Sequence, residues 1–320
     1  MPVRVLALDG GGIRGIVPAT VLAELERRTD KRVAELFDLI AGTSTGGILA
    51  LALTAPAADD PTRPRYAAAE LIDLYAKHGP EIFARRPLMA LRAIFEERYP
   101  KDGLERILAT YFGESRLKDA VTEVLVTSYD LEARDPWFFA RHKARESADS
   151  DFPLRLVARA TSAAPTYFEP LRLTSQTAMV DGGVFANNPG MCGYVEAIKL
   201  HGPGDVLVVS VGTGQVTTPI HYADAKGWGE VQWVRPVLDV AFDGVSDTVD
   251  HQLSWLLSDR DGKPRYVRFQ IELPSGMGSM DDTSAAHVAA LKEQGAKLVV
   301  DSAGRLDAVC GLLESLPEPA

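Results

Sequence analysis

The chain has 320 residues, 46% hydrophobic and 24% charged, which is an ordinary globular composition with enough apolar material for one large domain or two small ones. Its 34 basic and 44 acidic residues give a formal net charge of −10, which argues against a nucleic-acid partner because phosphates require a basic face. Overall charge also does not draw such a protein to an anionic membrane, so any lipid contact has to come from local apolar or basic surface.

The number and spacing of cysteines and the hydropathy of the chain indicate the cellular compartment of the protein. Cys192 and Cys310 form no C-x-x-C pair, which is typical of a reducing compartment and offers neither a disulfide framework nor a thiolate metal site. The N-terminal segment has no basic leader, apolar stretch and cleavage site in that order, so we expect no signal peptide. The most apolar region, 46–58, is shorter than the roughly 20 residues needed to span a bilayer. These features predict a cytoplasmic protein.

The first predicted elements are a strand and a helix on either side of a glycine-rich loop. Val3–Leu8 is apolar and bounded by glycines, and Ile16–Thr29 has helical spacing with Pro18 tolerated in its first turn. A second strand, 36–41, runs into the glycine-rich segment 42–47. The small apolar segment after it is predicted to be a buried helix.

The rest of the chain continues this alternation. The pattern predicts helices over 65–79, 101–113, 153–162, 189–201, 230–259 and 283–313, and strands over 123–128, 136–140, 178–180, 205–211 and 266–273. Strands that alternate with helices require crossover connections, which favour a mostly parallel sheet with helices on both faces. No linker, charge block or internal repeat divides the chain, so residues 1–320 are predicted to form a single three-layer α/β/α domain.

The strongest local signal is a G-x-S-x-G pattern at 42–46, between a predicted strand and a predicted helix. A serine hydroxyl is a weak nucleophile and has to lie on a tight turn where a base can reach it. Gly42 and Gly46 let the backbone make that turn. The N-terminus of the next helix favours negative charge developing nearby. Ser44 is therefore the candidate nucleophile, although the pentapeptide alone is equally compatible with a turn capped by serine or threonine.

A second glycine-rich segment, D-G-G-G-I-R-G at 9–15, follows the first strand. Its glycines can leave several backbone N–H groups pointing into one concavity, which would suit the oxyanion of an acyl-transfer reaction. The same segment matches the dinucleotide fingerprint G-x-G-x-x-G, which expects an acidic residue at the end of the next strand. Glu35 and Asp38 come before or at the start of that strand, and its end carries Gly42 and Ser44. The dinucleotide interpretation fails at this point.

A base for the serine is expected at Asp181, which follows a short apolar strand and precedes Gly182 and Gly183. This places a carboxylate at a strand end with no bulky neighbour to block it. Free aspartate titrates near pH ~3.9, so it can act as a base only in a dry site within hydrogen-bond reach of the serine hydroxyl. On composition alone, an aspartate that caps a turn is the more common explanation.

A histidine base is the alternative to Asp181. Four of the six histidines fall in or at the ends of predicted helices: His78, His201, His251 and His287. His142 and His221 lie in predicted polar loops, and neither follows a strand in a glycine-rich loop, where a triad histidine usually lies. No pair has the H-x-x-x-H spacing of a zinc helix, so no metal site is predicted.

Taken together, these segments resemble the patatin-like phospholipase family. That family is marked by a D-G-G-G-x-R-G loop, a G-x-S-x-G nucleophile and a D-G-[GA] aspartate, and all three stand here in that order at 9–15, 42–46 and 181–183. The stretches S-A-A-P-T-Y-F at 162–168, N-N-P at 187–189 and S-V-G-T-G at 210–214 are similar to further family blocks. The resemblance spans residues 3–214, and beyond it the chain is predicted only as helices and one strand that complete the fold.

The resemblance implies a lipid acyl hydrolase with a Ser-Asp dyad, no cofactor and no metal. Ser44 would attack the ester carbonyl, and Asp181 would take its proton. Arg14 would brace the glycine-rich loop or approach the phosphate of a lipid or phospholipid substrate. The oxyanion hole is expected from the backbone N–H groups of three residues, Gly10, Gly11 and Gly12. The sequence does not fix the oligomeric state.

Two segments are candidates for transient contact with a membrane surface. Residues 85–95 are basic and apolar against an acidic background, and they are predicted either as a lid or membrane contact or as a helix covering the core. Trp228 and Trp233 raise the same question, and we expect both to be buried. A non-catalytic lipid-binding or storage protein on the same fold is the other alternative to a hydrolase.

Overall fold

The computed structural model describes residues 2–84, 98–216, 219–259 and 262–315. Its strands are β1 (Val3–Leu8), β2 (Leu39–Thr43), β3 (Glu123–Asp130), β4 (Asp135–Ala140), β5 (Leu171–Thr174), β6 (Thr177–Asp181), β7 (Val206–Val211) and β8 (Tyr266–Phe269). Its helices are α1 (Ile16–Thr29), α2 (Val33–Leu36), α3 (Thr45–Thr54), α4 (Ala68–Ile82), α5 (Lys101–Phe112), α6 (Arg141–Glu146), α7 (Leu154–Thr161), α8 (Gly183–Ala186), α9 (Gly190–His201), α10 (Tyr222–Ala225), α11 (Glu230–Leu256), α12 (Ala285–Asp301) and α13 (Ala303–Glu314).

The strands form one mixed sheet in the order β5-β6-β3-β2-β1-β7-β8, with β4 also paired to β3. The run β3-β2-β1-β7-β8 is parallel, whereas β4, β5 and β6 join through antiparallel pairings. In the parallel run, the carboxyl ends of all strands meet at one edge of the sheet, so the loops after β1 and β2 are neighbours. The mostly parallel α/β sheet predicted from the sequence is confirmed.

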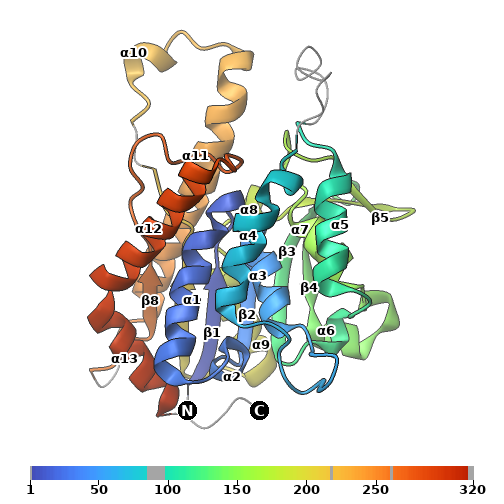
Figure 1. Ribbon diagram of the computed structural model, residues 1–320, viewed down its shortest axis with the longest axis vertical. Coiled ribbons are helices and arrows are strands. Elements are labelled where there is room, and N and C mark those ends of the chain that lie inside the picture. The colour runs from blue at the N-terminus through green and yellow to red at the C-terminus, as the bar shows by residue number, and fades with distance from the viewer. Residues whose placement is uncertain (1, 85–97, 217–218, 260–261, 316–320) are drawn as a thin grey trace.

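Helices cover both faces of the sheet, which gives the three layers visible in Figure 1. α1, α3 and α12 belong to the side with the larger apolar cluster, and α9 and α11 pack on the other side. Residues alternate between these two sides along β1, because Leu6 and Leu8 belong to the larger cluster and Val5 to the smaller one. Since both faces are covered, β1 and β7 are almost continuously apolar.

The structure departs most from the predicted elements at two places. β2 begins at Leu39 and not at 36, because residues before it form the short helix α2. Leu36 and Phe37 are buried in either arrangement, so their hydrophobicity did not reveal the boundary. The single helix predicted over 283–313 is two helices, α12 and α13, which meet at Ser302. The break lets both helices pack against α1.

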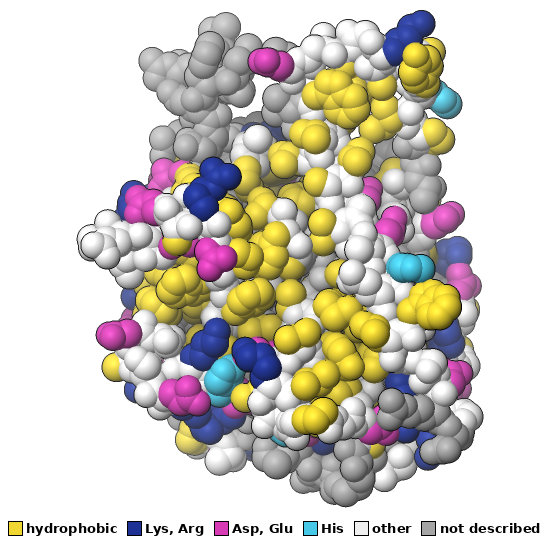
Figure 2. Space-filling model, turned by 180° about the vertical axis from the view of Figure 1, so that it is seen from behind, with side chains coloured by type: hydrophobic (Ala, Val, Ile, Leu, Met, Phe, Trp, Pro, Cys, Tyr) yellow, Lys and Arg dark blue, Asp and Glu magenta, His cyan; other side chains and the backbone are white. Residues whose placement is uncertain are grey.

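One end of the molecule is formed by α10 and the N-terminal part of α11, which extend beyond the sheet (Figure 1). Large apolar side chains are exposed along this end, namely Ile220, Tyr222, Trp233, Val237 and Val240. Figure 2 shows hydrophobic side chains gathered there. The expected burial of Trp228 and Trp233 is wrong, because 38% of Trp233 is exposed and Trp228 is only half-buried. In the part of the chain that the structure describes, no helix is long and apolar enough to cross a bilayer.

Candidate active site

Ser44 occupies a strained turn between β2 and α3. Its φ of 54° and ψ of −122° place a residue with a side chain in backbone space that glycine normally occupies. A Cβ atom on Gly42 would clash with the carbonyl oxygen of Gly46, and one on Gly46 would clash with the carbonyl oxygen of Leu8. The two glycines therefore let the turn close against the end of β1. This local geometry projects the serine side chain away from the sheet edge.

Hydrogen bonds from neighbouring elements hold this turn in place. The Ser44 N–H donates to Oγ1 of Thr161 in α7 at 2.8 Å. One residue earlier, Thr43 Oγ1 lies 2.7 Å from Thr127 Oγ1 on β3 and donates to the carbonyl oxygen of Ala186 at 2.6 Å. Since the Ser44 N–H is already engaged, it does not provide an oxyanion donor. Thr161 has no motif around it that marks this role in the sequence.

Strand register brings Asp181 to Ser44 although 137 positions separate them (181 − 44). Thr43, at the end of β2, pairs with Thr127 on β3, and Asp181, at the end of β6, pairs with the next β3 residue, Ser128. The ends of β2 and β6 therefore lie at successive positions along β3. Ser44 and Asp181 line the same cavity.

The Asp181 carboxyl group is buried, with 2% of the residue exposed. Burial raises its pKa to about 7, while hydrogen bonding by the Ser44 side chain and by the Gly183 N–H acts in the opposite direction. The Gly183 N–H donates to Oδ1 at 2.7 Å. A carboxyl group that titrates near neutral pH is a stronger base than an ordinary aspartate.

This pKa predicts the pH dependence of activity. If Asp181 has to be ionised to accept a proton, kcat/KM should rise about tenfold per pH unit below 7 and flatten above it, because kcat/KM reports ionisations of the free enzyme. The profile should be measured with an uncharged ester in buffers of constant ionic strength. A plateau that extends down to pH 5 would contradict a base with the pKa of Asp181.

The glycine-rich loop after β1 offers two free donors and not three. The Gly10 N–H donates to the Asn187 carbonyl oxygen at 3.0 Å, so the expectation that Gly10 is an oxyanion donor requires correction. Within the described residues, the N–H groups of Gly11 and Gly12 have no protein acceptor, and both glycines line the cavity that contains Ser44 and Asp181. Two unpaired N–H groups that border one cavity suit an oxyanion.

Contacts from the C-terminal part of the chain fix the shape of this loop. The Ile13 N–H donates to the Met280 carbonyl oxygen at 2.9 Å, and Thr213 Oγ1 donates to the Gly10 carbonyl oxygen at 2.8 Å. Gly12 adopts a φ of +59°, and a Cβ there would clash with Met280. Residues after β7 and β8 therefore hold the loop in place. Thr213 belongs to the S-V-G-T-G segment at 210–214, whereas Met280 lies beyond the part of the chain that the resemblance covers.

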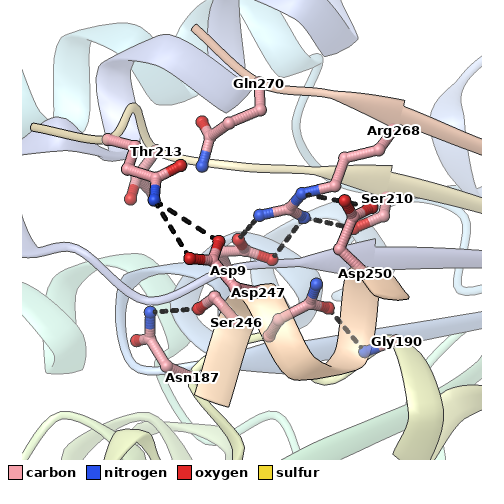
Figure 3. A network of polar contacts seen from close by, with 12 residues as sticks. Asp9, Asn187, Gly190, Ser210, Thr213, Ser246, Asp247, Asp250, Arg268 and Gln270 are labelled. Carbon is pink, nitrogen blue, oxygen red and sulfur yellow. Dashed lines mark hydrogen bonds and ion pairs between the residues drawn. The ribbon is translucent and has the colours of Figure 1, made fainter. Parts of the chain in front are cut away.

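Asp9, the residue after β1, forms an ion pair with Arg268 of β8 (Figure 3). The Arg268 Nη2 lies 2.6 Å from Asp9 Oδ2, and Nη1 donates to Ser210 Oγ at 2.7 Å. Burial acts to lower the pKa of Arg268. The charge and hydrogen bonds of the Asp9 carboxylate have a larger effect in the opposite direction, so the pKa of Arg268 is raised on balance. Asp9 is 2% exposed, so its charge depends on this partner. Arg268 thereby positions the residue from which the glycine-rich loop starts.

Replacing Arg268 with Met should reduce kcat about 10- to 100-fold and leave KM nearly unchanged, because the loop acts on the transition state and not on substrate binding. Arg268→Lys, which keeps the charge, should recover part of the loss. Both variants should be compared by steady-state kinetics after circular dichroism has shown that they are folded. A Met variant with wild-type kcat, or one that changes only KM, would rule out this positioning role.

The cavity containing Ser44 has a volume of about 320 Å³. Apolar side chains form much of its wall, including Ile48, Ile82, Phe83, Leu104 and Phe168. Such a wall accommodates an aliphatic chain but gives no stabilisation to a charged substrate. The cavity thus combines a hydroxyl, a carboxyl group, two backbone N–H donors and an apolar lining.

Other sequence candidates lie elsewhere. Arg14 does not line this cavity but a neighbouring one. His142 is in helix α6 and not in a loop, with Nε2 at 3.3 Å from Glu196 Oε1, and His221 precedes α10; neither lines the cavity. The predicted lid, 85–95, lies outside the described residues. Among the residues that are described, no three His, Cys, Asp or Glu side chains are grouped as for a metal ion.

The chain is similar to several known proteins. A family model described as patatin-like phospholipase matches residues 6–190. Patatin-like protein 2 of Oryza sativa subsp. indica is 33% identical over 97% of this chain and 86% of its own length. Probable inactive patatin-3-Kuras 1 of Solanum tuberosum is 31% identical over 94% of this chain and 87% of its own. Human GIVD cytosolic phospholipase A2 aligns with a TM-score of 0.43 and 12% identity over 98% of this chain and 60% of its own, too weak a likeness to carry an argument.

Proposed function

The chain belongs to the patatin-like phospholipase family, and from this premise we propose that it is a serine acyl hydrolase of lipid or phospholipid esters with a Ser44–Asp181 dyad. One observation carries the proposal. A serine held at a positive φ shares an apolar cavity with a buried carboxyl group whose pKa is raised to about 7 and with two backbone N–H groups. Each of these features costs stability or leaves a polar group unsatisfied, and together they suit acyl transfer.

In the proposed reaction, Ser44 Oγ attacks the ester carbonyl carbon while its proton passes to Asp181. The negative charge on the carbonyl oxygen is stabilised by the N–H groups of Gly11 and Gly12. The intermediate collapses to an acyl-serine, and the proton on Asp181 goes to the leaving alcohol. A water molecule then attacks the acyl-serine, with Asp181 accepting its proton and returning it to Ser44 as the fatty acid leaves.

We place this activity in a single catalytic domain over 1–320 that touches lipid transiently. The apolar side chains exposed along α10 and α11 support contact with a lipid surface. Cys192 and Cys310 are both free, which supports a cytoplasmic location.

The direct test is fatty-acid release from a panel of phospholipids, lysophospholipids and neutral esters, measured for the wild type and for Ser44→Ala. Release by the wild type alone would support the proposal. Because one relative is named as probably inactive, membership of the family does not by itself establish turnover. Binding of lipid without release of fatty acid from any ester would favour a lipid-binding protein.

A further inference from the structure

A second cavity, of about 550 Å³, adjoins the one that contains Ser44. The two cavities share four lining residues: Asp239, Phe242, Gly278 and Met280. The second space is therefore adjacent to the cavity in which an ester carbonyl would lie at Ser44. We call this space the head-group cavity, since the first cavity already offers the apolar wall for an acyl chain.

One wall of the head-group cavity carries Arg14. Among the described residues, the only hydrogen bond from its guanidinium is a long one, from Nε to the Gly11 carbonyl oxygen at 3.4 Å, and it forms no ion pair. Burial lowers the pKa of Arg14, and Asp243 and Asp239 on the opposite helix act against that change. A guanidinium with donors left over, facing a cavity beside an ester-binding site, suits a phosphate group, which takes two such donors at once.

The facing wall combines acidic and aromatic groups. Asp239 and Asp243 are four residues apart on α11 and so lie on one face of the helix, and both line the cavity. Burial raises the pKa of Asp243, and the Arg14 charge opposes the rise.

Two aromatic rings line the same cavity, those of Trp228 and Phe242. Trp228 is braced by Trp233, whose ring centroid lies 5.1 Å away at an interplanar angle of 77°. A carboxylate beside aromatic faces is the arrangement that attracts an organic cation. Much of the remaining lining is apolar, formed by Val216, Ile220, Pro236, Val240 and Met280. Such a lining suits a methylated ammonium, which needs no hydrogen-bond acceptors, better than a primary one.

We propose that the head-group cavity binds the phosphocholine group of a choline phospholipid. The phosphate contacts Arg14, and the trimethylammonium group lies between Asp243 and the faces of Trp228 and Phe242. This assignment rests on the proposed function, which it extends by naming the head group of the substrate.

The kinetic test uses short-chain phosphatidylcholine and phosphatidylglycerol below their critical micelle concentrations, so that no lipid surface contributes. The wild type should have the higher kcat/KM for phosphatidylcholine. Asp243→Asn and Trp228→Ala should each lower that value about tenfold and leave phosphatidylglycerol within about twofold. Glu230→Gln, at the start of α11 and outside the cavity lining, is the matched control and should leave both values unchanged.

Binding of free phosphocholine to Ser44→Ala, followed by calorimetry, separates this inference from the proposed function because it needs no catalysis. Phosphocholine should bind to Ser44→Ala, and adding Asp243→Asn should weaken the affinity about tenfold. Equal kcat/KM for the two lipids together with no phosphocholine binding would overturn the head-group assignment while leaving the hydrolase proposal in place. Phosphocholine binding without hydrolysis of any ester would uphold the cavity and refute the hydrolase.

Discussion

Replacing Ser44 with Ala or Asp181 with Asn should each reduce fatty-acid release about 10⁴-fold, with the double variant little worse than either single variant. The reason is that a hydroxyl and its base act as one unit, so that losing either removes the same step. The residual rate would come from substrate binding and the N–H groups of Gly11 and Gly12, which both variants keep. Initial rates on the best ester from the lipid panel, measured over a wide range of enzyme concentrations, provide the comparison.

Stability measurements on the same variants give the control. The pKa of Asp181 is raised in the folded protein, so the stability of the wild type falls as pH rises through about 7. Asp181→Asn, which carries no charge, should therefore melt at a higher Tm than the wild type at pH 9, and the difference should vanish toward pH 4. An Asp181→Asn variant that melts lower at every pH would show that its loss of activity is structural. Losses that multiply in the double variant would refute the dyad.

Replacing Gly11 with Ala should reduce kcat about 10²- to 10³-fold, which is the loss expected when an oxyanion donor is displaced. A Cβ atom at this position would clash with the side chain of Thr213, so the loop has to move and its N–H groups move with it. KM should change little, because the carbonyl oxygen gains most of its charge only in the transition state.

Gly304→Ala is the matched control for this substitution. Gly304 lies in α13, where an added Cβ meets no neighbouring atom. This variant should keep full activity and gain a little stability, since alanine favours a helix over glycine by about 1 kcal/mol. Full activity in Gly11→Ala, or an equal loss in Gly304→Ala, would exclude the glycine-rich loop as the oxyanion site.

Periodicity predicted most of the elements because their environments are strongly apolar. β1 and α1 have the bounds that the sequence predicts. Nearly all residues of β1 are buried, and α1 buries one apolar face. The hydrophobic pattern was less informative where a residue would be buried both in a strand and in a helix, as at the start of β2. It could not find the break at Ser302, because α12 and α13 present apolar residues to the same partner helix.

Some residues of the site could also be predicted from the sequence, and others could not. Ser44, Asp181 and the glycine-rich loop could be predicted from local sequence. Tight turns require glycine, and the spacing of the glycines around these residues is recognisable. Ser44 and Asp181 are brought together by the register of β2 and β6 along β3, and no local sequence pattern determines that register. Thr161, Met280 and Arg268 could not be found from the sequence, because each acts through long-range hydrogen bonds or an ion pair. The pairing of the Gly10 N–H with Asn187 likewise becomes visible only in the folded chain.

Covalent labelling by a fluorophosphonate, located by peptide mass spectrometry, tests most directly whether Ser44 is the nucleophile. We expect one adduct per chain, on the peptide containing Ser44, with fatty-acid release lost in proportion to labelling and with no adduct in Asp181→Asn at pH 8. An enzyme that releases fatty acid at its full rate while Ser44 stays unmodified, or an inactivating adduct on another residue, would contradict the mechanism proposed for this protein.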